Sequence, residues 1–176
     1  MNIKLKKKGI LFWITGYSGS GKSEISNKLK NFIEKKFGKT IILSGDDFRK
    51  TFKINNYDKK SRINLGNQYT DFLNIILKQN INIIFTVVGL YHKIRNYNLT
   101  KIDNYIEIFI DANICDIIKN SKKIHYKRKQ KNIFGIDLMA ELPKKPNIIV
   151  KNNFKTSTSN LAKEIMNKLK IYEKNK

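Results

Sequence analysis

Residues 16–23 have the sequence GYSGSGKS, which matches the pattern G-x-x-x-x-G-K-[ST]. Glycines in this pattern let backbone N–H groups turn inward and hold phosphate oxygens at the start of a helix. We expect Lys22 to reach the β- and γ-phosphates and the Ser23 hydroxyl to bind Mg²⁺. An apolar run, ILFWIT, precedes the pattern, and a helical run with apolar residues on one face follows it. The sequence therefore predicts a phosphate-binding loop that consists of Gly16, Ser18, Gly19, Ser20, Gly21, Lys22 and Ser23.

A second polar group, SGDDFR at residues 44–49, follows another strand-like run. Open α/β sheets hold their ligands at the edge where the parallel strands end. Phosphoryl transfer uses a carboxylate that orients the accepting hydroxyl or holds Mg²⁺ through water, together with a cation for the acceptor's own phosphate. Asp46 and Arg49 suit these roles; in the alternative interpretation, Asp46 or Asp47 only caps the helix that follows. The third strand-like run, IIFTVVGL, ends without Asp or Glu, so the carboxylate role falls to Asp46.

Apolar, β-branched runs alternate with amphipathic helical stretches along the chain, which favours a parallel sheet covered by helices on both faces. We expect five strands, at residues 10–15, 40–43, 81–88, 105–110 and 147–150. The helical patterns cover residues 22–36, 58–78, 114–120 and 157–173. The predicted fold class is α/β, with a mainly parallel five-stranded sheet flanked by helices.

The chain has 176 residues, which suits one domain when a domain has about 150 residues. No internal repeat or Pro/Ser-rich linker divides the sequence, so we expect a single domain over residues 1–176. Residues 119–132, KNSKKIHYKRKQKN, are rich in basic and poor in apolar side chains, which suits a basic lid over phosphates. A solvated loop is equally compatible with this composition.

The 36 Lys and Arg residues and the 14 Asp and Glu residues give a formal net charge of +22, which invites a nucleic-acid function. Proteins that read bases and phosphates rely on the bidentate guanidinium group, whereas here the Arg residues are only Arg49, Arg62, Arg95 and Arg128. Lys, Asn and Ile are abundant together, which indicates codon bias toward adenine and thymine. We therefore expect solvated lysine faces and no specific nucleic-acid partner. A polyanionic small substrate would gain from the same positive field.

No apolar run approaches the roughly 18 residues of a membrane span, and the N-terminal segment has no small-residue cleavage site of a secretory signal. We therefore expect no membrane partner and a cytoplasmic location. The single cysteine, Cys115, excludes an internal disulfide and fits a reducing compartment. Cys115 and Trp13 each lie on an apolar element, so we expect both in the core. His92 and His125 have no partners at metal-ligand spacing, which favours surface or lid positions over a zinc site.

Taken together, these segments resemble the adenylylsulfate kinase family over nearly the whole chain. The similarity lies in FWITGYSGSGKS, LSGDDFR, Arg62, IIFTVVGLYHKIR, YIEIFID and NIFGIDLMAELPKKPNIIV. The resemblance implies a P-loop NTPase fold, ATP with Mg²⁺ as the donor, and transfer to the 3′-hydroxyl of a nucleotide that bears an acid anhydride. It also implies that Asp46 acts on that hydroxyl, that Arg49 and Arg62 hold the acceptor's phosphate groups, and that Phe134 covers its base. Members of this family are commonly dimers, so a homodimer is implied as well.

The chain departs from the family pattern where the family binds its acceptor. The family has Asp before the Arg that matches Arg62 and an Asn-Ile-Arg-Arg run after it, whereas here Ser61 precedes it and Leu65, Gly66, Asn67 and Gln68 follow. A Ser-Pro-aromatic-Arg segment after the third strand is replaced by GLYH at residues 89–92. The family's lid pattern is also changed, to NSKKIHY at residues 120–126.

These departures make the sequence similar to cytidine diphosphoramidate kinases of capsule assembly, which share YDK-x-x-R and the ending G-[IV]-D-x-x-x-E-x-P, here GIDLMAELP. Three interpretations stay open: an adenylylsulfate kinase, a kinase for another nucleotide anhydride such as cytidine diphosphoramidate, and a copy that binds ATP without turnover. A nucleic-acid binder with an incidental phosphate loop is the least favoured.

Overall fold

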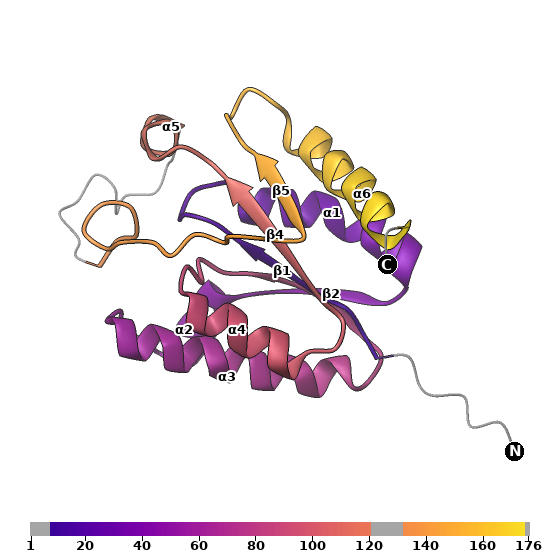
Figure 1. Ribbon diagram of the computed structural model, residues 1–176, viewed down its shortest axis with the longest axis horizontal. Coiled ribbons are helices and arrows are strands. Elements are labelled where there is room, and N and C mark those ends of the chain that lie inside the picture. Colours follow the sequence, from indigo (N-terminus) through magenta and orange to yellow (C-terminus); the bar gives the residue numbers. More distant parts are fainter. Residues whose placement is uncertain (1–7, 121–131, 175–176) are drawn as a thin grey trace, which may run out of the picture.

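The computed structural model describes residues 8–120 and 132–174, and Figure 1 shows a sheet with helices on both of its faces. The strands form one sheet in the order β2-β3-β1-β4-β5, with the bounds β1 Leu11–Thr15, β2 Thr40–Ser44, β3 Asn82–Thr86, β4 Tyr105–Asp111 and β5 Ile148–Lys151. The helices are α1 Lys22–Phe37, α2 Gly45–Thr51, α3 Lys59–Leu77, α4 His92–Lys101, α5 Ile114–Asn120 and α6 Thr158–Lys174.

Every pairing between the strands of this sheet is parallel, so the predicted α/β class and the five-stranded parallel sheet are confirmed. The central strands β1 and β3 are buried along their whole length. Helices cover both of their faces, which is why these strands are nearly continuous apolar runs rather than alternating ones. The predicted strand positions agree with the structure to within two residues at each end.

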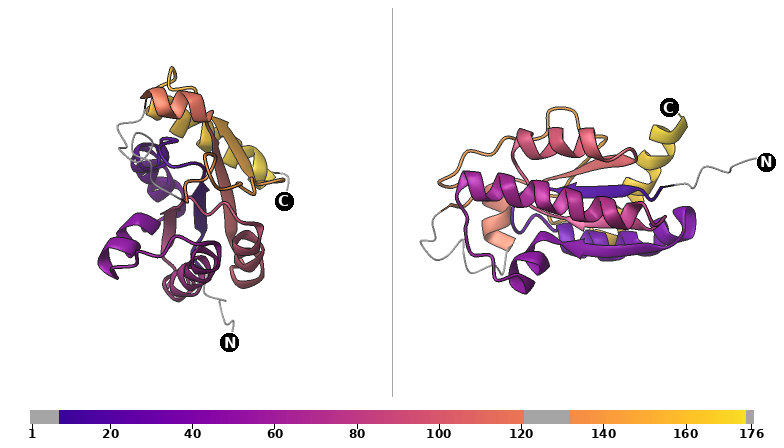
Figure 2. Two further views of the ribbon diagram at one scale, coloured as in Figure 1. Left: turned by 90° about the vertical axis from the view of Figure 1, so that its left-hand side faces the viewer. Right: turned by 90° about the horizontal axis from the view of Figure 1, so that it is seen from below.

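The core has two layers, one on each face of the sheet (Figures 1 and 2). On one face, α1 and α6 pack together over Phe12 and Ile14 of β1. On the other face, α3 and α4 cover Leu11 and Trp13. The predicted apolar stripe of α6 is buried at Leu161, Ile165 and Leu169, as expected for a helix that packs on the sheet.

Two helices were not predicted from apolar periodicity. Helix α2 has seven residues and begins with a side-chain cap at Ser44 rather than with an apolar pattern. Helix α4 buries Ile94, Arg95 and Asn98, so two of its inward-facing side chains are polar. A helix that buries polar residues has almost no amphipathic signal, because that signal depends on apolar residues along one face.

Three further expectations have different outcomes. Trp13 is buried as predicted, whereas the prediction for Cys115 is wrong, because this residue is exposed and Ile117 is the buried residue of α5. Helix α5 has only seven residues, and it buries one side chain, that of Ile117, in the core. The predicted basic lid at residues 119–132 lies almost entirely outside the described residues, as does His125. No helix in the described part of the chain has the length and apolar character to cross a membrane.

A leucine pair tests the assignment of the core. Leu29 in α1 is fully buried, whereas Leu99 in α4 is 65% exposed. Leu29→Ala should lower the free energy of unfolding by about 2–5 kcal/mol, because it removes buried methyl groups and leaves a cavity. Leu99→Ala is the matched control and should change it by no more than about 0.5 kcal/mol. Urea unfolding measures both; equal effects of the two variants would contradict this packing.

Candidate active site

The turn between β1 and α1 is built from glycines at positions that other residues cannot occupy. Gly16 has a φ of 146° and Gly21 a φ of 90°, both in the region that favours glycine. A Cβ at Gly16 would lie 2.5 Å from the carbonyl oxygen of Ile110, and one at Gly21 would lie 2.7 Å from Nδ2 of Asn152. Sterics and backbone conformation therefore both require glycine at these two positions of the predicted loop.

Lys22 lies in the first turn of α1, where its side chain folds back over the loop. Its Nζ donates to the carbonyl oxygens of Gly16 at 2.9 Å and Tyr17 at 2.7 Å, and the residue is only 9% exposed. Ser20 Oγ is buried and has no hydrogen-bond partner among the described residues. A buried hydroxyl without a partner is uncommon, and it marks this loop as a site where a polar ligand would complete the hydrogen bonding.

Asn152, the residue after β5, supports the phosphate loop through a hydrogen bond to its backbone. Its Nδ2 donates to the carbonyl oxygen of Ser20 at 3.0 Å, and its Oδ1 accepts the N–H of Phe154 at 2.9 Å. A residue 132 positions away in sequence thus fixes the backbone at Ser20. No local pattern pointed to this residue, because its role depends on the position of β5 in the sheet.

The two adjacent aspartates at the start of α2 have different surroundings. Ser44 Oγ accepts the N–H of Asp47 at 3.0 Å and donates to Asp47 Oδ2 at 2.7 Å, so Ser44 and Asp47 cap the helix. Asp46 instead lines a cavity next to the phosphate loop. The N-cap is thus Ser44 rather than either aspartate, and Asp47 supports it through its carboxylate, while Asp46 lies where the sequence placed the carboxylate of a binding site.

This cavity has a volume of about 470 Å³ and lies at the carboxyl edge of the sheet. It brings together Ser18 of the phosphate loop and the four residues predicted for the acceptor: Asp46, Arg49, Arg62 and Phe134. The cavity is also lined by aromatic residues that the sequence analysis did not assign to a site, namely Trp13, Tyr57, Tyr69 and Tyr91. Tyr57 is the first residue of the YDK-x-x-R segment, which ends at Arg62. This spacing in the sequence is a signal that could have pointed to Tyr57 as a site residue.

Two arginines hold the chain between α2 and α3 and flank the Tyr57 ring. Arg49 Nη1 donates to the carbonyl oxygen of Asn56 at 2.9 Å, and Arg62 Nε donates to that of Tyr57 at 2.7 Å. Their guanidinium carbons lie 4.3 Å and 5.2 Å from the centre of the Tyr57 ring. Burial, and then the positive charge of Arg49, lower the pKa of Arg62. Two like charges in one cavity attract an anion, which would relieve their mutual repulsion.

Residues 132–141, which we call the strap, form the outer wall of the cavity. Arg62 Nη2 donates to the carbonyl oxygen of Asn132 at 2.6 Å, and the Arg62 guanidinium carbon is 4.9 Å from the centre of the Phe134 ring. The Phe134 ring also packs edge-on against Tyr91, with ring centres 5.0 Å apart. Asp137 holds this turn by accepting the backbone N–H groups at residues 132 and 133.

Gly135 brings the strap into contact with the phosphate loop. A Cβ there would lie 2.1 Å from Cδ1 of Ile114 and 3.0 Å from Cε1 of Tyr17, and the residue has a φ of 82°. The strap therefore contacts the phosphate loop through Gly135 and forms the cavity wall through Phe134. The loop and the cavity are two neighbouring parts of one site.

The inner wall of the cavity is apolar, with a contribution from Leu65, Gly66, Gly89, Leu90 and Ile94. Gly66 is packed closely, because a Cβ there would lie 2.6 Å from Cδ1 of Ile94. The departures from the resembled family at residues 65–66 and 89–90 thus lie together on one surface of the cavity. This surface offers no charged side chain and no side-chain amide from these five residues.

The oxygen ligands of the phosphate loop suit a Mg²⁺ ion that is bound to a nucleotide. The exposed Ser23 hydroxyl lies at the mouth of the phosphate loop, and Mg²⁺ prefers oxygen ligands from one or two protein groups and from phosphates. The described residues contain no group of three or more His, Cys, Asp or Glu side chains that could hold a metal ion. The residues therefore fit a nucleotide-bound Mg²⁺ rather than an all-protein metal cage.

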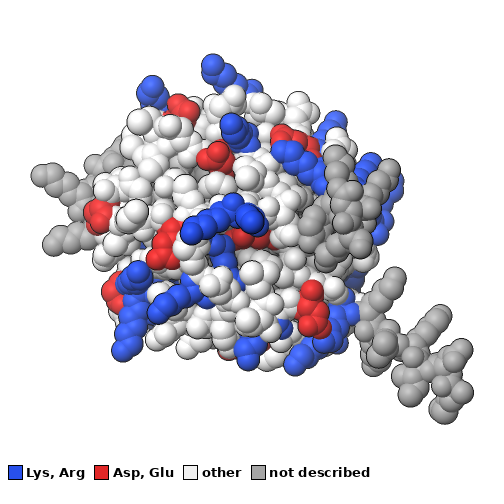
Figure 3. All heavy atoms as spheres, viewed as in Figure 1, with Lys and Arg blue, Asp and Glu red and all other residues white. Residues whose placement is uncertain are grey.

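Basic side chains do not form one continuous surface on the face shown in Figure 3. Lys and Arg lie there in several separate groups, with Asp and Glu among them. An electrostatic footprint for nucleic acid consists of basic side chains clustered on one face, which this face does not show. The absence of a specific nucleic-acid partner stays a prediction.

A glycine-rich phosphate loop after the first strand, beside a cavity with Asp and Arg at the same sheet edge, defines a P-loop kinase. Residues 8–151 match the family model described as Adenylylsulphate kinase, which covers most of the chain. The chain therefore belongs to the adenylylsulfate kinase family.

Individual relatives and structures agree with this family. The cytidine diphosphoramidate kinase of Campylobacter jejuni is 25% identical over 171 residues, which cover 95% of this chain and 100% of that protein. The adenylyl-sulfate kinase of Buchnera aphidicola is 30% identical over 166 residues, with 84% and 76% covered. The structure of the Mycobacterium tuberculosis APS kinase in complex with AMPPNP and APS has a TM-score of 0.81 at 20% identity, with 93% and 98% covered.

Proposed function

We propose that this protein transfers the γ-phosphoryl group of ATP to the 3′-hydroxyl of a nucleotide anhydride. One observation carries the proposal: the phosphate loop, through Ser18, opens into the same cavity that holds Asp46, Arg49, Arg62 and Phe134. Kinases need a triphosphate site and a hydroxyl site in direct contact, because phosphoryl transfer depends on positioning the two oxygens in line.

The phosphate loop supplies the donor half of the reaction. Backbone N–H groups of residues 16–23 surround the phosphates, and the Lys22 ammonium leaves the loop carbonyls to contact the β- and γ-phosphates. Ser23 would hold Mg²⁺, which would offset the negative charge on the phosphates of the bound nucleotide. Lys22 stabilises the transition state, since its charge lies beside the group being transferred.

Asp46 serves the acceptor half. Its carboxylate takes the proton of the acceptor hydroxyl while that oxygen forms a bond to the γ-phosphorus and the bond to the ADP oxygen breaks. Arg49 and Arg62 hold the anionic tail of the acceptor, because both residues line the same cavity as Asp46. Phe134 and Tyr57 provide aromatic rings for the base. The centre of each ring lies within 5.2 Å of the Arg62 guanidinium carbon.

The identity of the acceptor base depends on the apolar inner wall. Two candidates follow from the relatives, adenylylsulfate and cytidine diphosphoramidate. Leu65 and Gly89 stand where the resembled pattern has Asn and Ser, and the relative from C. jejuni aligns with this chain over its full length. Both observations favour an acceptor other than adenylylsulfate, since hydrogen bonds to the base provide most of the discrimination between nucleotides.

Lys22→Ala tests the donor site. We expect turnover to fall by a factor of about 10² or more, because the side chain acts on the phosphates. Lys28→Ala, at an exposed position of the same helix, is the matched control and should keep the original turnover. The measurement is ADP release from Mg·ATP with the preferred acceptor. Full turnover by the Lys22 variant would contradict the assignment of the phosphate loop.

A panel of acceptors tests the hydroxyl site. With adenylylsulfate and cytidine-based anhydrides, we expect a preference of about tenfold or more in kcat/KM for one member, which corresponds to about 1.4 kcal/mol. Arg49→Ala should abolish useful turnover of every member, because the anionic tail loses its anchor. Lys50→Ala, on the exposed side of α2, is the control.

Each outcome of the panel has a distinct meaning. Strong and exclusive turnover of adenylylsulfate would show that the altered inner wall did not change the substrate. ATP binding without turnover of any member would contradict the kinase proposal and favour a copy that only binds ATP.

Measurement of the molecular mass in solution tests the homodimer that the family resemblance implies.

A further inference from the structure

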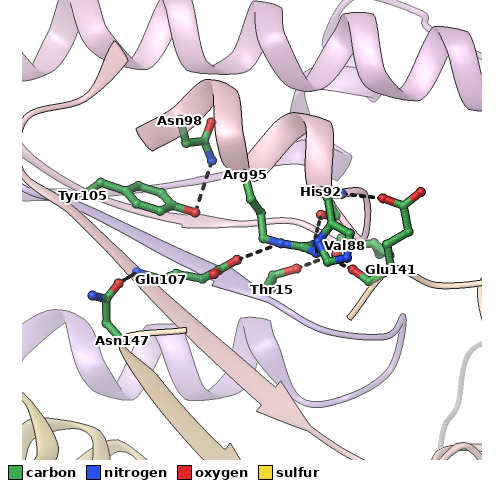
Figure 4. Close-up of polar contacts among 10 residues, drawn as sticks. Thr15, Val88, His92, Arg95, Asn98, Tyr105, Glu107, Glu141 and Asn147 are labelled. Atoms are coloured by element: carbon green, nitrogen blue, oxygen red, sulfur yellow. Dashed lines mark hydrogen bonds and ion pairs between the residues drawn. The ribbon is translucent and has the colours of Figure 1, made fainter. Parts of the chain in front are cut away.

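Arg95 lies at the centre of a buried polar network behind the cavity (Figure 4). This residue of α4 is 5% exposed, and its Nε lies 3.6 Å from Oε1 of Glu107 on β4. Its Nη1 donates to the carbonyl oxygen of Gly89 at 3.4 Å, and its Nη2 donates to that of Glu141 and contacts His92 Nδ1. One guanidinium group thus joins the inner wall of the cavity to the end of the strap.

Glu141 fastens the strap to the start of α4. Its N–H donates to the carbonyl oxygen of Leu90 at 3.0 Å, and its carboxylate accepts the N–H of His92 at 2.6 Å. Helix α4 has no side-chain cap of its own at Tyr91, so Glu141 supplies one from another segment. Glu141 thus holds the backbone on both sides of Tyr91, at Leu90 and His92. Because the Tyr91 ring packs against Phe134, Glu141 helps to position these two rings in the cavity.

Glu107 is the buried carboxylate that faces the Arg95 guanidinium group. It is 7% exposed, and its Oε1 has no hydrogen-bond partner among the described residues, so its contribution is electrostatic rather than directional. Burial raises the pKa of Glu107 to about 7, although the charge of Arg95 acts in the opposite direction. Burial also lowers the pKa of Arg95. A buried cation that loses its counter-charge is strongly disfavoured and turns toward water or another carboxylate.

We propose that Glu107 is a positioning residue for acceptor binding, which acts through Arg95 to hold the Gly89–Tyr91 wall against the strap. Glu107 does not line the cavity and touches no substrate in this account. Without its charge, the Arg95 guanidinium shifts toward the Glu141 carboxylate and releases the two backbone carbonyls that it holds. This inference rests on the proposed function, because it assigns the cavity between the wall and the strap to the acceptor.

Glu107→Gln tests the structural half of the proposal in the free protein. The variant keeps the size of the side chain and removes its charge. We expect amide hydrogen exchange at His92 and Glu141 to become about tenfold faster or more, whereas amides of α1 and α6 on the opposite face of the sheet keep their protection. Glu164→Gln, which breaks an exposed ion pair with Lys168, is the matched control and should leave His92 and Glu141 unchanged. Unchanged exchange in the Glu107 variant would overturn the proposal.

Steady-state kinetics test the functional half. Well above pH 7, where Glu107 is charged, Glu107→Gln should raise the KM for the preferred acceptor by about tenfold or more, while the KM for ATP changes by no more than about twofold. The double variant Arg95→Met/Glu107→Leu removes both charges and should keep the melting temperature of the original protein, since apolar residues often replace a buried ion pair without loss. Its acceptor KM should be as high as that of Glu107→Gln; an original melting temperature together with an original acceptor KM would show that the pair only fills volume and would overturn the proposal.

The pH dependence separates positioning from stability. Below pH 7 Glu107 takes up a proton, so the acceptor KM of the original protein should rise as the pH falls, and that of Glu107→Gln should lack this rise. The free energy of unfolding changes in the opposite direction. The folded state binds this proton more tightly than the unfolded state, so the contribution of Glu107 to stability increases as the pH falls from about 7 to 4.5. Arg95 and Tyr105 face Glu107. The other charged or titratable groups of the network are His92, Glu141, Lys144 and Lys59, whose Nζ lies 3.4 Å from Oε1 of Glu141, and both the original protein and Glu107→Gln contain all of them.

These results distinguish two failures. Faster exchange at His92 and Glu141 without turnover of any acceptor would contradict the proposed function and not the network. Turnover of an acceptor with an unchanged acceptor KM in Glu107→Gln would contradict the positioning role and not the proposed function.

Discussion

The turn from β1 into α1 is the constraint on which the rest of the structure depends. Here the chain leaves a fully buried strand and must point its backbone N–H groups inward within a few residues. Gly16 and Gly21 allow this turn, because their φ values are positive and the Cβ positions are occupied by Ile110 and Asn152. The loop is therefore fixed by the two strands, β4 and β5, that lie on one side of β1.

The strands on the other side of β1 position residues of the proposed acceptor site. Asp46 and Arg49 follow β2, and the Gly89 wall follows β3, so both end at the edge where the phosphate loop lies. The strap crosses this edge and contacts the phosphate loop at Gly135 and the cavity at Phe134. A parallel sheet thus explains why residues far apart in sequence form one site, since all of its strands end on the same side.

The sequence was sufficient to predict features that depend on local geometry. The phosphate loop is a continuous segment with a fixed spacing, and the strands that surround it are apolar runs, so both were predicted with nearly the observed bounds. Asp46, Arg49, Arg62 and Phe134 do lie in one cavity, although their grouping came from a family resemblance rather than from spacing. Their chemical roles stay predictions.

Features that depend on tertiary packing were beyond the sequence. Helix α4 was missed because it buries Arg95 and Asn98, and Arg95 has meaning only beside Glu107, which comes from another element. Tyr57 and Tyr91 gained a role only when the chain brought them to the arginines and to Phe134. Cys115 was placed in the core by an apolar pattern that the short helix α5 buries only at Ile117.

The central claim is that the phosphate loop and the cavity are the donor and acceptor halves of one active site. A crystal structure with Mg²⁺, a non-hydrolysable ATP analogue and the acceptor that the panel selects tests this claim most directly. The account predicts triphosphate oxygens on residues 16–23, and an acceptor hydroxyl beside Asp46 at about 3–3.5 Å from the γ-phosphorus. An acceptor bound outside the cavity, or a triphosphate bound away from the loop, would contradict it.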